Sequence, residues 1–183
     1  MMAIMGESGS GKTTLLNTLA HQKPKSMKMS GDIKINGKIV DIRPIAAYVE
    51  QSDIFIPTLT VYEHLMFTGT LVLRNKLPHE KVRKKVEEIL TEFSLDSCRN
   101  TRIGSIEKGT GISGGERRRL AIASQIIASP KIIFLDEPTT GLDSHTAETV
   151  IKILKRLSEK NCAMVATIHQ PSSQIFKYFD RFE

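Results

Sequence analysis

The 183-residue sequence contains no tryptophan, only two cysteines and few aromatic residues, which make up 5% of the chain. The cysteines, Cys98 and Cys162, lie far apart and form neither a Cys-x-x-Cys pair nor a zinc-ligand spacing. This usage argues against a zinc domain or a disulfide framework. It favours a reduced, cytosolic setting in which both thiols serve as small buried hydrophobic groups.

Long hydrophobic runs are also missing. No apolar run approaches the roughly 20 residues that a membrane-spanning helix needs. The apolar start, residues 1–5, has neither a basic leader nor a cleavage-type region, so it is not a signal peptide. With 40% hydrophobic and 25% charged residues, we expect a soluble chain that forms one domain with a real core.

The net charge of +6 has two interpretations. The excess of Lys and Arg can simply be solvated on helix surfaces, or it can attract ATP and anionic lipid headgroups. Nucleic acid is disfavoured as a partner, because the basic stretches carry no interleaved aromatic residues.

The strongest motif is a glycine-rich loop of the form G-x-x-x-x-G-K-[ST]. It consists of Gly6, Glu7, Ser8, Gly9, Ser10, Gly11, Lys12 and Thr13, followed by Thr14. Glycines let the backbone approach phosphates, and the freed N–H groups together with the following helix start form an anion site. Lys12 supplies a positive charge to the β- and γ-phosphates, and the Thr13 hydroxyl suits Mg²⁺. The glycine spacing does not fit G-x-G-x-x-G, which disfavours a dinucleotide site.

Around this loop, apolar runs typical of strands alternate with helical periodicity. We expect strands at residues 2–5, 46–50, 131–135 and 162–168, and a hairpin of residues 32–36 and 38–41 that turns at Asn36-Gly37. We expect helices at residues 13–20, 60–73, 79–93, 114–128, 144–160 and 172–179. The order predicts an α/β protein: a P-loop NTPase core with a mostly parallel sheet, a small antiparallel β portion and an inserted helical subdomain at about residues 58–128.

Polar residues follow several of these strands. Asp136 and Glu137 end the apolar run at residues 132–135, at the sheet edge where α/β proteins bind ligands. Asp136 is placed to hold the Mg²⁺ shell, and Glu137 to take a proton from the attacking water. Gln51 and His169 follow two other strands. We expect the Gln51 amide to reach both Mg²⁺ and the attacking water, and we expect His169 to hydrogen-bond the γ-phosphate. Each of these residues, taken singly, also fits a merely solvated strand end.

A second glycine-rich segment, Ser113, Gly114, Gly115 and Glu116, opens the helix at residues 114–128. A serine hydroxyl and glycine N–H groups at a helix start form a second anion site. Because one chain does not need two γ-phosphate sites, we interpret it as a contact to the ATP of another copy. An ordinary helix cap is the alternative.

In this order, these motifs resemble the nucleotide-binding domain of ABC transporters. The finer sequence resembles the G, or white-type, subfamily, chiefly in the segments 137–144 (EPTTGLDS) and 167–173 (TIHQPSS). The resemblance implies ATP and Mg²⁺ as cofactors, with Thr13, Gln51 and Asp136 on the metal and with Glu137, Gln51 and His169 in catalysis. It also implies a head-to-tail dimer of nucleotide-binding domains, in which Ser113 contacts the partner's ATP and Asp143 lines the interface.

The resemblance further implies that a transmembrane domain is driven by ATP hydrolysis at the cytoplasmic side of a membrane. Members of the family carry strands before the phosphate loop, including an adenine-stacking aromatic residue, and continue beyond the position of Glu183. We therefore expect the chain to be a fragment, a truncated gene model or a reduced paralogue that binds ATP weakly on its own.

Three rival functions differ in what they leave unexplained. A soluble ABC ATPase of DNA repair carries a long coiled-coil insertion, for which there is no room between Gln51 and Ser113. A soluble ABC ATPase of translation carries two nucleotide-binding domains in one chain. A remnant that binds ATP without hydrolysing it would act only as an interaction module. A P-loop kinase or GTPase leaves Ser113 and His169 without a role.

Overall fold

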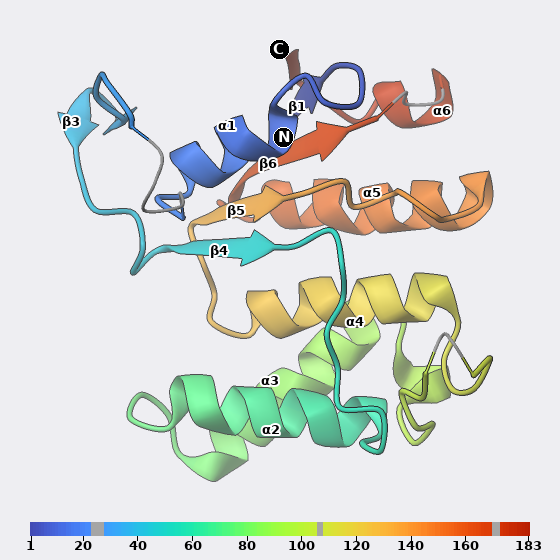
Figure 1. Cartoon of the computed structure of the whole chain (residues 1–183). Coiled ribbons are helices and arrows are strands. Elements are labelled where there is room, and N and C mark those ends of the chain that lie inside the picture. Colours follow the sequence, from blue (N-terminus) through green and yellow to red (C-terminus); the bar gives the residue numbers. More distant parts are fainter. Residues whose placement is uncertain (23–27, 106–107, 170–172) are drawn as a thin grey trace.

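The computed structural model describes residues 1–22, 28–105, 108–169 and 173–183 and places a parallel sheet beside a group of packed helices (Figure 1). The sheet has the strand order β4-β5-β6-β1-β7. Its strands are β1 (Met2–Met5), β4 (Ala46–Val49), β5 (Ile132–Leu135), β6 (Ala163–Ile168) and β7 (Arg181–Phe182). All neighbouring strands pair in parallel, which confirms the predicted α/β fold with its mostly parallel sheet.

Helices cover both faces of this sheet, because successive strand residues point to opposite sides. Helix α1 (Lys12–Leu19) packs on one face through a small cluster that includes Ile4, Leu16 and Phe134. On the other face lies the larger core, where Ile133 and Leu135 share one cluster with residues of α4 (Gly114–Ile126) and α5 (Ser144–Ser158).

The middle of the chain is helical, as expected. It contains α2 (Val61–Leu73), α3 (His79–Glu92) and a short 3₁₀ helix, η1 (Asp96–Cys98), which the sequence did not predict. Thr60 caps α2 through a capping box with Glu63, and α2 packs against both α3 and α4. Helix α4 in turn contacts β4, so it joins the helical part to the sheet. The limits of a helical subdomain at about residues 58–128 stay a prediction.

The antiparallel portion is the predicted hairpin, with shorter strands. Strands β2 (Lys34–Ile35) and β3 (Lys38–Ile39) pair in antiparallel fashion. Asn36 and Gly37 have φ values of 50° and 78°, as a two-residue hairpin turn of this handedness requires.

The end of the chain differs from the expectation. The last helix, α6, covers only Ser173–Phe176, and Ser172, where it was predicted to begin, lies outside the described residues. Beyond α6 the amides of Tyr178 and Phe179 bond three residues back, so the chain turns instead of continuing as an α-helix. The turn lets β7 pair with β1. A strand of two residues is too short to show the alternating pattern from which a strand is predicted.

The strand register aligns the carboxyl ends of the strands that carry the predicted site. Met5 is paired with Ile168, so Gly6 and His169 leave the sheet side by side. Leu135 is paired with both Val49 and Ala166, so the segments after β4, β5 and β6 emerge at the same edge.

Candidate ATP site

A polar cavity of about 670 Å³ lies at this edge of the sheet. It is lined by Ser8, Gly9, Gly11, Lys12, Thr13, Thr14, Gln51, Glu137, Thr140 and His169. Residues predicted from four separate motifs therefore converge on one cavity, across more than 160 positions of sequence from Ser8 to His169. Their chemical roles are not shown by this geometry alone and stay predictions.

The phosphate loop is shaped by two glycines with positive φ, 80° at Gly9 and 91° at Gly11. A Cβ at either position would meet no neighbouring atom, but residues with a side chain rarely adopt this positive φ. The backbone conformation, not the available space, therefore requires glycine there. Gly11 is the N-cap of α1 and offers no side-chain acceptor. The N–H groups of the first helical turn are therefore left for an anion, which the helix dipole also attracts.

Lys12 is 7% exposed, and its ammonium group donates to the carbonyl oxygens of Gly6 and Glu7, both at 2.9 Å. These contacts hold the long side chain across the loop. The charge is thus placed at the cavity wall and is already ordered, which lowers the entropy cost of binding a phosphate.

Asp136 is almost fully buried and lies beside two hydroxyl groups. Its Oδ1 accepts from the hydroxyl of Thr13 at 3.1 Å and from the hydroxyl of Thr167 at 2.6 Å. The Thr13 and Asp136 oxygens come from the phosphate loop and from the end of β5, and such hard oxygen donors are what Mg²⁺ prefers. Among the described residues no group of three or more His, Cys, Asp or Glu side chains is arranged to hold a metal.

Glu137 has an unusual backbone and a well-anchored carboxylate. Its φ of 46° is in the left-handed region, which is costly for a residue with a Cβ. The backbone N–H donates to the Thr167 hydroxyl at 2.8 Å, and Oε2 accepts from Gln51 Nε2 at 3.0 Å and from the Thr140 hydroxyl at 2.9 Å. Gln51 and Glu137 are thus in direct contact across the ends of β4 and β5.

The second glycine-rich segment lies elsewhere. Ser113 caps α4 through a capping box: its amide and hydroxyl both donate to Glu116 Oε2 at 2.8 Å, and the Glu116 amide donates back to the hydroxyl. Burial raises the pKa of the Glu116 carboxyl, but the contacts that favour its charged form, chiefly the hydrogen bonds from Ser113, together lower it by more, so the net effect is a lowered pKa. Among the described residues, those that line the cavity include neither a residue of this segment nor Asp143. Figure 1 shows the first turn of α4 well apart from the loop that joins β1 to α1.

Asp143, the remaining predicted interface residue, caps α5. Its Oδ1 accepts from the amides of His145 and Thr146 at 3.1 and 3.0 Å, and the contact with Thr146 is the main reason why its pKa is lowered.

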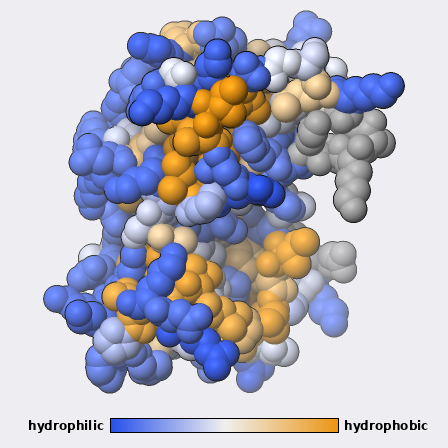
Figure 2. All heavy atoms as spheres, turned by 90° about the vertical axis from the view of Figure 1, so that its left-hand side faces the viewer, coloured by the Kyte–Doolittle hydropathy of each residue, from blue (hydrophilic) through white to orange (hydrophobic). Residues whose placement is uncertain are grey.

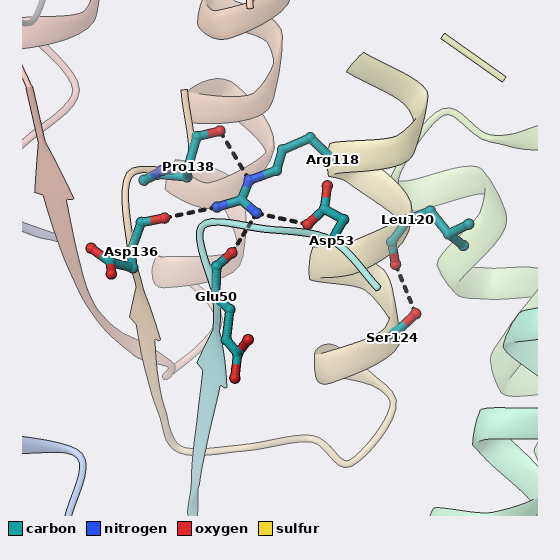
Figure 3. Close-up of polar contacts among 7 residues, drawn as sticks. All are labelled: Glu50, Asp53, Arg118, Leu120, Ser124, Asp136 and Pro138. Carbon is teal, nitrogen blue, oxygen red and sulfur yellow. Dashed lines mark hydrogen bonds and ion pairs between the residues drawn. The ribbon is translucent and has the colours of Figure 1, made fainter. Parts of the chain in front are cut away.

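The sequence did not single out Arg118, which the structure buries at the centre of a polar network (Figure 3). Its guanidinium bonds four groups on two segments that leave the sheet: the carbonyl of Glu50, the carboxylate of Asp53 and the carbonyls of Asp136 and Pro138. Burial raises the pKa of the Asp53 carboxyl, and the Arg118 charge opposes that shift. Arg118 lies four positions before the buried Ile122 on α4, and this spacing was the available signal that it faces inward.

Thr140 and Thr167 were also missed as members of the site. Thr167 is fully buried and joins Asp136 to the Glu137 backbone, whereas Thr140 holds the Glu137 side chain. A hydroxyl within an otherwise apolar strand was the signal for Thr167. Gln170, Pro171 and Ser172, part of the segment that resembled the G subfamily, lie outside the described residues.

A parallel sheet with a glycine-rich phosphate loop after its first strand and acidic residues after another strand is the architecture of a P-loop NTPase. Comparisons with known proteins extend this assignment. The sequence model of the ABC transporter family matches residues 1–140. The chain is 44% identical to the Drosophila melanogaster protein white over 99% of its own length and 46% identical to the scarlet protein of the same species over 98%. It is 43% identical, over 99% of its length, to ABC transporter G family member 14 of Dictyostelium discoideum.

A solved dimeric ATP-binding cassette in a post-hydrolysis state, bound to ADP and Pi, has a TM-score of 0.72 and 29% sequence identity. The match covers all of this chain and 79% of that one. The chain therefore belongs to the ABC transporter family as an ATP-binding domain of the ABC ATPase type. Its relatives place it in the G, or white-type, subfamily. It spans 27% of the length of white and scarlet and 13% of the Dictyostelium protein.

Proposed function

We propose that this domain binds ATP with Mg²⁺ in the polar cavity, hydrolyses it in a head-to-tail dimer and thereby drives transport by a membrane domain. One observation carries the proposal: the phosphate loop, Gln51, Glu137 and His169 line one cavity at the carboxyl edge of a parallel sheet. The solved relative that holds ADP and Pi supports a nucleotide in the equivalent fold.

The phosphate chain would lie along the uncapped first turn of α1, with its terminal oxygens toward the Lys12 ammonium. Thr13, Asp136 and the Gln51 side chain would hold Mg²⁺. When bound, this ion neutralises the negative charge that develops on the phosphates. His169, which also lines the cavity, would donate to the γ-phosphate.

Glu137 is proposed to accept the proton of the attacking water. Its Oε2 is engaged by Gln51 and Thr140, so the carboxylate is held at the cavity. The raised energy of its left-handed backbone is offset by the Thr167 contact, which fixes the main chain beside the buried Asp136. Hydrogen bonds to both the side chain and the backbone of Glu137 thus hold the proposed base at the cavity.

A second copy is proposed to complete the site. Ser113 lies apart from the cavity of its own chain, and Ser113 and Gly114 are exposed at the start of α4, where the helix dipole attracts an anion. In a head-to-tail dimer, this segment would meet the γ-phosphate held by the other copy, and Asp143 would lie at the interface.

The membrane domain is proposed to dock where the helical part meets the sheet. A groove of about 440 Å³ lies there, lined among others by Asp53, Ile54 and Val72. Ile54 is 86% exposed, and Ile56, Phe67, Leu71 and Val72 add exposed apolar surface nearby on the same loop and on α2. Apolar surface is not confined to this groove: Figure 2, which views the left-hand side of Figure 1, shows hydrophobic side chains on both the helical half and the sheet half of that face. Among the described residues, none of the helices combines the length and the apolar character that a bilayer crossing requires.

Hydrolysis is tested by Glu137→Gln, with Glu88→Gln on the exposed face of α3 as the matched control. Loss of the base should lower the turnover number by roughly 10²-fold or more, because general bases contribute on that order. Binding of a fluorescent ATP analogue should stay within about twofold, since the substitution leaves the phosphate loop intact. Wild-type turnover in Glu137→Gln would refute the role of Glu137. ATP binding without turnover in the wild type would instead identify a binding module.

The dimer is tested in the Glu137→Gln background by size-exclusion chromatography with and without MgATP. The added substitution Ser113→Arg should abolish the ATP-dependent dimer. Thr60→Arg, which disrupts the other capping box away from the proposed interface, should leave the dimer in place. Equal effects of the two arginines would argue against the proposed interface.

Docking of the membrane domain is tested by comparing ATP turnover of the chain with and without that domain in detergent. Ile54→Asp should remove stimulation by the membrane domain and leave the basal turnover unchanged. Equal stimulation of variant and wild type would rule out this docking surface.

A further inference from the structure

We propose that Arg118 is a positioning residue for hydrolysis, which fixes the backbone on both sides of Glu137 relative to the Gln51 segment. The inference rests on the proposed function of Glu137. It concerns a residue on α4 that lines neither the cavity nor the docking groove.

The contacts of Arg118 bracket the two residues that act on the attacking water. Its guanidinium bonds the carbonyl of Asp136 at 2.9 Å and that of Pro138 at 3.3 Å, which are the residues immediately before and after Glu137. It also bonds the carbonyl of Glu50, the residue before Gln51, at 2.6 Å. Figure 3 shows these oxygens arranged around a single guanidinium group.

Only arginine has the chemistry for this arrangement. A guanidinium carries five N–H donors in one rigid plane, so it can bond several acceptors on different chain segments without adjusting its shape. Arg118 is 5% exposed, and the nearby Asp53 carboxylate, at 2.8 Å, offsets the cost of burying its charge. A lysine could keep the charge but not the four contacts.

The same side chain links helix α4 to the ATP site of its own chain. Arg118 lies on α4, the helix whose first turn carries Ser113 and is proposed to meet the partner's ATP. A displacement of α4 on nucleotide binding at that remote site would therefore move the backbone around Glu137 in the chain's own site. Arg118 thus couples the occupancy of one ATP site to the alignment of the base in the other.

Arg117→Lys is the matched control for the decisive substitution, Arg118→Lys. Arg117 is the preceding residue, is also 5% exposed, and likewise bonds backbone carbonyls, but those of Ile103 and Gly104. Both variants lose buried guanidinium contacts, so a purely structural role predicts similar changes in both. The measurements are the turnover number, the Kd of a fluorescent ATP analogue and the thermal midpoint, all at a temperature where both variants are folded.

The positioning role predicts that Arg118→Lys lowers the turnover number by about tenfold or more, since small misplacements of reacting groups are costly, while Kd changes by less than about threefold. Arg117→Lys should retain turnover within about threefold of the wild type. Equal losses in both variants, or a loss in Arg118→Lys that appears in Kd alone, would overturn the inference.

If Arg118→Lys does not fold, the variant Asp53→Asn tests the positioning role of Arg118 instead. It keeps an oxygen acceptor but removes the charge that holds the guanidinium, so turnover should fall by about threefold or more with Kd unchanged. Wild-type turnover in Asp53→Asn would then refute the role of Arg118. A wild-type chain without any turnover would instead remove the proposed function, and this inference with it.

Discussion

The hydroxyl of Thr167 offers the sharpest test of how the site is built. Thr167 is fully buried; it donates to Asp136 Oδ1 at 2.6 Å and accepts from the Glu137 amide at 2.8 Å. Thr167→Val has nearly the same shape, so it removes these two hydrogen bonds without opening a cavity.

The expected loss of stability follows from the two groups left behind. A hydrogen bond to a charged group is worth about 1.5–3 kcal/mol, and a buried amide without an acceptor costs about 1–3 kcal/mol. Asp136 keeps its contact with Thr13, which reduces the first contribution. We therefore expect the free energy of unfolding to fall by about 3 kcal/mol, and the thermal midpoint by roughly 6–12 °C for a domain of this size.

Urea unfolding followed by circular dichroism measures this difference directly. Thr167→Ser, which keeps the hydroxyl, should lose only about 1 kcal/mol for its missing methyl group. Thr149→Val, which removes an exposed helical hydroxyl bonded to a backbone carbonyl, should change stability by less than about 0.5 kcal/mol. If Thr167→Val loses no more than Thr167→Ser, the bridge does not stabilise the site and the reasoning is wrong.

Three further predictions concern neighbouring groups. Lys12→Ala should weaken binding of a fluorescent ATP analogue by about 10- to 100-fold, because it removes a charged contact worth about 1.5–3 kcal/mol; wild-type affinity in a titration would contradict this. Gly115→Ala should lower the free energy of unfolding by about 1–3 kcal/mol, since its Cβ would lie 2.2 Å from Thr146 Cγ2, whereas Gly114→Ala meets nothing closer than 3.9 Å and should be tolerated. The lowered pKa of Glu116 implies a stabilisation that is present above the ordinary glutamate pKa of 4.5 and is lost as the pH falls below it through the folded-state pKa. The stability difference between wild type and Glu116→Gln should therefore shrink below pH 4.5 in unfolding titrations, and a difference independent of pH would count against the capping box.

The elements that could be predicted are those specified by short-range chemistry. The apolar run at residues 132–135, the hairpin turn at Asn36-Gly37 and the helix at residues 60–73 each depend on neighbours in sequence. The structure has all three, with the helix beginning one residue later, at Val61. Strand order places Gln51 and Glu137 at one edge, which is why the cavity could be anticipated from strand ends alone.

The elements that were missed depend on distant parts of the chain. Three consecutive arginines, Arg117, Arg118 and Arg119, are most simply interpreted as a solvated surface, yet the first two are 5% exposed. Their acceptors are carbonyls of the loops after β4 and β5 and of Ile103 and Gly104, and these are positioned only by the folded arrangement. Strand β7 is likewise defined by its partner β1, not by any pattern of its own.

The position of β1 in the sheet also has a consequence for synthesis on the ribosome. Its two neighbours are β6 and β7, which comprise residues 163–168 and 181–182. The strand that leads into the phosphate loop is therefore made well before either of the strands that flank it. Since parallel pairing between such distant segments forms slowly, the nascent chain should expose β1 as an unpaired apolar strand until β6 and β7 have emerged, and it should acquire nucleotide affinity only after that point.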